Sequence, residues 1–116
     1  MGNRWLVSIA SRNGRERVEL VDLRNGQPVP LPGINQADAQ PISVSVSADG
    51  NRIALIRSRD GRTELMLYRR GVGILQRLPV EPAGVPREVS LDGSGRLLAV
   101  QVSRQGRWDV DLIRLP

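Results

Sequence analysis

The side chains best suited to bind another molecule in this sequence are its arginines. Every one of the 17 basic residues is an arginine, and the planar guanidinium pairs in a bidentate way with phosphates and carboxylates. Six of them recur in a motif, Ser-Arg-x-Gly-Arg, that occurs three times. These candidate site residues are Arg12, Arg15, Arg59, Arg62, Arg104 and Arg107.

Two interpretations of these arginines compete. In one, they form a basic rim for an anionic partner, such as an acidic protein, a phosphate-bearing surface or a nucleic acid. In the other, they are solvated hairpin tips, neutralised across the strand or by Glu16, Glu64 and Asp109, and their number reflects the codon bias of a GC-rich genome. Nucleic acid is the weakest partner, because two tryptophans and one tyrosine offer little surface for base stacking.

The composition excludes much catalytic chemistry. Cysteine and histidine are absent, so the chain has no thiol nucleophile, no disulfide, no Ser-His-Asp triad and no thiolate or imidazole ligand for a metal. Carboxylates remain, but each has a role in a turn or an ion pair, and no spacing marks a catalytic pair. The segment Asp92-Gly93-Ser94-Gly95 has a single carboxylate, too few for calcium. We therefore expect no enzyme activity, no metal and no cofactor.

Internal repeats are the strongest signal in the rest of the sequence. The arginine motif begins at Ser11, Ser58 and Ser103, at spacings of 47 and 45 residues. A period of about 40 to 50 residues made of short strands is typical of propeller blades. Residues 42–47 alternate an apolar residue with serine, as a strand does. The Asn-Gly and Asp-Gly pairs at 13–14 and 60–61 favour type I′ hairpins.

These signals predict an all-β fold, a β-propeller segment of about three blades within a single domain spanning residues 1–116. The blade repeats are expected at residues 1–37, 38–82 and 83–116. With the strands of a blade lettered a to d from the centre outward, the chain reads b-c-d, a-b-c-d and a-b-c. Because strands alternate in direction, the repeated b–c hairpins emerge on one face, where the six arginines are expected to share a rim.

The middle repeat resembles a known one. Ser47-Ala48-Asp49-Gly50-Asn51-Arg52-Ile53-Ala54-Leu55, followed by Ser58-Arg59-Asp60-Gly61, is similar to the TolB-type, WD-like β-propeller repeat, which has a Ser-Pro-Asp-Gly turn, an apolar strand and a Ser-x-x-Gly hairpin. Here Ala48 replaces the proline. The resemblance implies a bacterial interaction module located in the periplasm or otherwise outside the cytoplasm. It transfers no site residue, because the motif is structural.

Three blades are fewer than the four to eight of a closed propeller. The two end blades would expose apolar faces, which soluble monomers rarely do. We therefore predict a homodimer that closes a six-bladed ring and acts as a non-catalytic binding or scaffold module. The alternatives are that the chain is part of a longer propeller, a glycan-binding propeller, or the accessory propeller domain of a larger hydrolase.

The two tryptophans have different expected positions. Trp5, aligned with Ile53 and Leu97, is predicted to lie in the core. Trp108 opens a c strand and is predicted to be partly exposed, either as a contact residue or as a cap on an open edge. No apolar run is long enough to span a membrane, and no signal peptide is visible.

Overall fold

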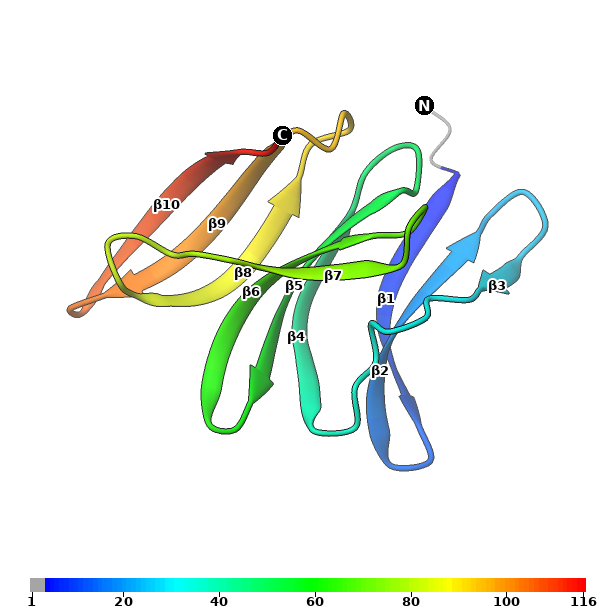
Figure 1. The fold of residues 1–116 in the computed structure, drawn as a ribbon, viewed down its shortest axis with the longest axis horizontal. Coiled ribbons are helices and arrows are strands. Elements are labelled where there is room, and N and C mark those ends of the chain that lie inside the picture. The colour runs from blue at the N-terminus through cyan, green and yellow to red at the C-terminus, as the bar shows by residue number, and fades with distance from the viewer. Residues whose placement is uncertain (1–3) are drawn as a thin grey trace.

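The computed structural model describes residues 4–116, which form three antiparallel sheets of three, four and three strands. Figure 1 shows the sheets side by side as a fan, with the hairpins along one rim. The strands are β1 (Trp5–Arg12), β2 (Arg15–Asp22), β3 (Gln27–Val29), β4 (Ala39–Val46), β5 (Arg52–Arg59), β6 (Arg62–Arg69), β7 (Ile74–Leu78), β8 (Val85–Leu91), β9 (Leu97–Arg104) and β10 (Arg107–Arg114). The sheets contain β1 to β3, β4 to β7 and β8 to β10, so the predicted all-β series b-c-d, a-b-c-d and a-b-c is confirmed.

The three repeated turns are tight two-residue hairpins. Both central residues have positive φ in each turn, with 53° and 77° at Asn13 and Gly14 and 53° and 72° at Asp60 and Gly61. Gln105 adopts the same conformation, with a φ of 47°, although glutamine is a poorer turn former than asparagine or aspartate. The matching geometry gives the three hairpins the same register.

That register corrects the predicted alignment of Trp5. Counted back from the hairpin glycines, Trp5 and Leu97 both align with Arg52 rather than with Ile53. A shift of one residue turns a side chain to the opposite face of a sheet. Leu97 accordingly lies exposed on the outer face of the third sheet, and Trp5 is half-buried over Gly50 at the end of the second sheet.

The second sheet is the centre of the core, because both of its faces are covered. One face packs against the first sheet, and the other packs against the third. This explains why β5 is almost continuously apolar, as a strand buried on both faces must be. The first contact joins Ile53, Leu55, Met66 and Tyr68 to Val18 and Leu20. The second contact joins Ala54, Ile56, Leu65 and Leu67 to Leu98, Val100 and Val102.

Serine side chains join the inner strands of neighbouring sheets. The backbone N–H of Val89 in β8 donates to the Ser43 hydroxyl of β4 at 3.2 Å, and that of Leu91 donates to Ser45 at 2.8 Å. The alternation in residues 42–47 therefore does more than form a strand. Its serines accept hydrogen bonds from the backbone of the next blade, a contact that the strand pattern alone did not predict.

Candidate functional site

The outer face of the third sheet is an exposed apolar surface. Trp108, Val110 and Leu112 of β10 are 68%, 63% and 68% exposed. Ala99 and Leu97 of β9 belong to the same face, since Ala99 lies directly opposite Leu112 and Leu97 two positions along. We call these five residues the C-terminal face. The expectation that Trp108 is exposed is confirmed.

In the second sheet, the residues equivalent to Val110 and Leu112 are covered by a neighbouring sheet. Leu65 and Leu67 follow the hairpin glycine of the second sheet by four and six residues, as Val110 and Leu112 do in the third. Leu65 and Leu67 are each only 1% exposed, because the third sheet covers them. The C-terminal face is thus a blade-stacking surface that no part of residues 4–116 covers.

The opposite end of the fan has an outer face of mixed character. Leu6 and Leu23 are exposed there, and Arg12 makes a bidentate ion pair with Glu19 at 2.9 and 3.1 Å. This ion pair raises the pKa of Arg12 and lowers that of Glu19. We call the outer surface of β1 and β2 the N-terminal face.

Each of the other two sheets has an arginine–carboxylate pair on its corresponding face. There the pair is covered by the link that precedes the sheet: the first link, residues 30–38, before β4, and the second link, residues 79–84, before β8. Arg57 donates to Glu64 and to the side chain of Gln36 in the first link, both at 3.0 Å. Arg104 donates to Asp111 at 2.9 Å and to the Pro82 carbonyl of the second link at 2.9 Å. In all three sheets the partners are seven residues apart.

The six rim arginines therefore divide into two groups. Arg104 is buried between Asp109 and Asp111, Arg12 is paired with Glu19, and Arg59 lies 3.9 Å from Glu64. These three stand at the ends of the first strands of the hairpins. The other three, Arg15, Arg62 and Arg107, open the second strands and are exposed, with no ion pair among residues 4–116.

The electrostatics of the Arg104 cluster are those of a structural ion pair. The hydrogen bonds that Arg104 donates to Asp111 raise the pKa of Arg104, and those to Asp109 add to the effect. Conversely, the Arg104 guanidinium holds the pKa of the Asp111 carboxyl below its ordinary value. Both partners are thereby kept charged, and the guanidinium is occupied by protein oxygens rather than offered to a ligand.

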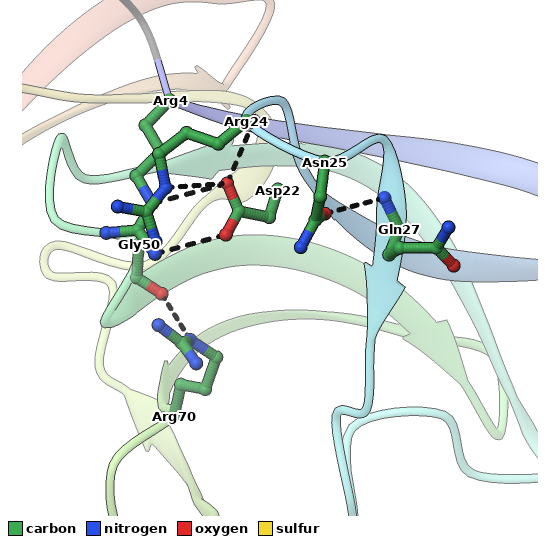
Figure 2. A network of polar contacts seen from close by, with 7 residues as sticks. All are labelled: Arg4, Asp22, Arg24, Asn25, Gln27, Gly50 and Arg70. Atoms are coloured by element: carbon green, nitrogen blue, oxygen red, sulfur yellow. Dashed lines mark hydrogen bonds and ion pairs between the residues drawn. The ribbon is translucent and has the colours of Figure 1, made fainter.

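The end opposite the hairpins is closed by a second polar cluster, centred on Trp5. The guanidinium carbons of Arg4 and Arg70 lie 4.6 and 4.7 Å from the indole centroid, close enough for cation–π attraction. Figure 2 shows Arg4 paired with Asp22, at 3.2 and 3.1 Å, and Arg70 donating to the Gly50 carbonyl at 2.7 Å. The cluster fastens the first sheet to the second.

Aspartates shape the turns between inner and second strands. The carboxylate of Asp49 accepts from the Ser47 hydroxyl at 2.6 Å and from the Asn51 backbone at 2.9 Å, which lowers its pKa. Asp92 accepts from the backbone of Arg96 and Leu97, which also lowers its pKa. Residues 4–116 contain no group of three or more carboxylates arranged as metal ligands, and no helix long and apolar enough to cross a membrane.

Comparison with known proteins adds one finding. No family model matches the sequence, and no match was found among curated proteins. Among solved structures, the chain is similar to the crystal structure of TolB from Acinetobacter baumannii, with a TM-score of 0.71 and 19% identity over 97% of this chain. The chain spans 27% of the length of that TolB chain. At this identity the likeness shows the fold alone, and the chain therefore has a TolB-like β-propeller fold, present as three blades.

Proposed function

We propose that the chain is a non-catalytic binding and scaffold module that binds a second copy of itself. Two copies stacked head to tail, with the C-terminal face of each on the N-terminal face of the other, close a ring of six blades. The observation that carries this proposal is a difference in exposure. Val110 and Leu112 are open to solvent, whereas Leu65 and Leu67, at the same positions of the second sheet, are buried by the next blade.

The two end faces suit such a junction. A head-to-tail contact closes when its rotation divides the circle, and two copies use the same pair of faces twice. Leu6 and Leu23 give the N-terminal face apolar surface. Its ion pair, Arg12 with Glu19, is satisfied within one chain, so covering the pair leaves neither partner unpaired. Arg15 and Arg17 on the same face are exposed and would need to stay at the solvated rim of the junction or meet carboxylates of the second copy.

Two single variants test the head-to-tail arrangement. Leu6→Glu puts a charge on the N-terminal face and Leu112→Glu puts one on the C-terminal face, so each should weaken self-association about tenfold or more. Mixed together, the two variants retain one undamaged junction and should form a mixed dimer. Packing of two C-terminal faces against each other would instead leave Leu6→Glu as dimeric as the parent chain.

A matched control separates these effects from added charge alone. Val72, in the turn between β6 and β7, is 67% exposed and lies on neither end face. Val72→Glu should therefore leave the mass in solution unchanged. If Leu6→Glu and Leu112→Glu also leave it unchanged, the ring is contradicted.

A second proposed property is binding of an anionic partner, such as an acidic protein, along the hairpin rim. Arg15, Arg62 and Arg107 support it, because they are exposed and repeat once per blade on one side of the fan. Arg12, Arg59 and Arg104 contribute the ion pairs that stiffen the same hairpins. Heparin is a suitable anionic probe, and the matched variants are given in the Discussion.

We also propose that residues 1–116 act as one domain, with blades at residues 1–37, 38–82 and 83–116. The support is the middle sheet, which packs on both neighbours through the two contacts of the core. A single calorimetric transition is expected, and separate transitions for the blades would contradict it. We propose an extracytoplasmic location, which the TolB-like resemblance supports and which fractionating cells would test.

A further inference from the structure

We infer that the free edge of β1 is a binding site for an extended peptide segment that alternates serine with β-branched apolar residues. β1 stands at the edge of its sheet, whose order is β1-β2-β3. In the other two sheets the corresponding strand has an inner neighbour, since β4 lies beside β5 and β8 lies beside β9. The first sheet lacks that inner strand within residues 4–116.

The backbone of β1 is poised to pair. The Leu23 N–H donates to the Arg4 carbonyl at 2.7 Å, and the bonds of an antiparallel ladder alternate along a strand. The backbone groups of Trp5, Val7 and Ile9 therefore point to the free edge. In the second sheet, Arg52 holds the position of Trp5, and its carbonyl accepts from the turn that ends the inner strand β4, at 2.9 Å.

The place of the missing strand is open. A cavity of about 310 Å³ lies between β1 and β4 and is lined by residues 4–7 and 44–48. β1 packs against β4 in the same way as β5 packs against β8. The first sheet has therefore not moved to fill the space of the missing inner strand. Trp5 is among the residues that line the cavity, and its indole provides a built-in optical probe.

The chemistry of the occupant follows from the serine contacts of β4. The N–H groups of Val89 and Leu91 point away from β9 and are accepted by serines of β4. In β4, the Ser47 N–H donates to the Arg52 carbonyl of β5. Because the direction of the N–H groups alternates along a strand, those of Val44 and Val46 point away from β5, toward the cavity that these two residues line. An incoming strand with hydroxyls at alternate positions would accept these two bonds and pair with β1 on its other edge. The incoming strand would then contact β4 in the same way as β4 contacts β8.

The edge strand β10 of the third sheet is built differently from β1. β10 carries four charged residues in eight, whereas β1 carries only Arg12 in the same length. Charged residues on an edge strand discourage added strands. The incoming peptide is therefore expected at β1 and not at β10.

The probe is a blocked peptide with the sequence of residues 40–47, Gln-Pro-Ile-Ser-Val-Ser-Val-Ser. In Trp108→Phe, Trp5 is the only tryptophan, and its fluorescence should change to saturation as peptide is added. Replacing the serines equivalent to Ser43 and Ser45 by alanine should weaken binding about tenfold. N-methylation of the peptide at the alternate backbone amides that face β1 removes the N–H donors of the added strand. It should abolish binding without altering the protein.

Amide hydrogen exchange locates the added strand. Peptide should slow exchange at Val7 and Ile9, whose N–H groups face the free edge, and leave that at Leu6 and Ser8 unchanged. Protection along β10 instead, equal binding of the serine and alanine peptides, or no saturable change at Trp5 would overturn the proposal. Self-association through the end faces is measured separately by mass, so loss of one property does not imply loss of the other.

Discussion

Val110 occupies in the third sheet the position that Leu65 occupies in the second, four residues after the hairpin glycine, yet Val110 is 63% exposed and Leu65 is 1% exposed. Both residues are apolar, and they differ in whether another sheet covers them. Leu65 lies under the next blade, and Val110 has no next blade among residues 4–116. A blade between two neighbours is apolar on both faces because each face is half of a junction, and the proposed ring would give the end blade the neighbour that it lacks among residues 4–116.

Gly50→Ala should destabilise the chain by about 2 to 4 kcal/mol. Gly50 has a φ of +72°, and a Cβ there would lie 2.4 Å from the Trp5 ring, which is held between two arginines. Gly14→Ala is the matched control, since Gly14 has a φ of +77° but no atom within 4 Å of the added Cβ. It should cost only about 1 kcal/mol of backbone strain. Equal losses in urea unfolding would show that Trp5 moves aside freely.

Gln105→Asn should stabilise the third hairpin by about 0.5 kcal/mol, because asparagine tolerates the left-handed conformation better than glutamine. Gln105 has a φ of 47° in the same turn position as Asn13. The reverse change, Asn13→Gln, should destabilise the first hairpin by a similar amount. Chemical unfolding of both variants checks the pair, and shifts of the same sign would contradict the shared turn geometry.

Asp111 should make stability depend on pH at the acid end. Its folded pKa is lowered by Arg104, so its contribution is fully present above the ordinary aspartate pKa of about 3.9. The contribution is lost as pH falls through the lower folded pKa. Asp111→Asn should therefore be less stable than the parent at neutral pH, with the difference narrowing toward pH 2. Asp38→Asn, which removes an exposed carboxylate of the first link, should change the curve little. A constant difference at all pH values would rule out the ion pair as the cause.

Changing the exposed rim arginines Arg15, Arg62 and Arg107 together to serine should abolish binding to heparin and leave the fold intact. The control changes three exposed arginines away from the hairpins, Arg77, Arg96 and Arg114, and removes the same net charge. Binding by the parent should weaken steeply with salt, since exposed charges are screened within about 8 Å at physiological ionic strength. Equal losses from the two triple variants would mean that only net charge matters.

The strands and turns were predictable from sequence because they depend on local signals. Residues 42–47 alternate with period two, and x-Gly pairs mark the hairpins. The alignment of Trp5 was wrong because arginines precede β1 and β9 by one residue but begin β5. A shared arginine is a weaker guide to register than a turn glycine, whose positive φ fixes the hairpin.

The different fates of the rim arginines could not be predicted from their shared motif. Arg12 and Arg104 share the Ser-Arg-x-Gly-Arg motif, but among residues 4–116 a link covers only the second of these two arginines, and its Pro82 carbonyl accepts the Arg104 hydrogen bond. The serine contacts were equally hidden, because Ser43 and Ser45 act on a strand more than 40 positions away. The buried pairs Arg57–Glu64 and Arg104–Asp111 share a spacing of seven residues. Arg15 and Asp22 have the same spacing, but Asp22 pairs with Arg4 and Arg24 instead, so the spacing alone could not identify the pairs.

The proposed ring requires the two end faces to bind one another, and the mass of the unmodified chain in solution tests this. Light scattering on the eluate of a sizing column, over a range from low to high micromolar concentration, measures it without a label. A ring of two copies predicts a mass twice the 12.8 kDa of the chain, with no larger species because the ring has no free end. A well-folded monomer of 12.8 kDa across that range would contradict the account.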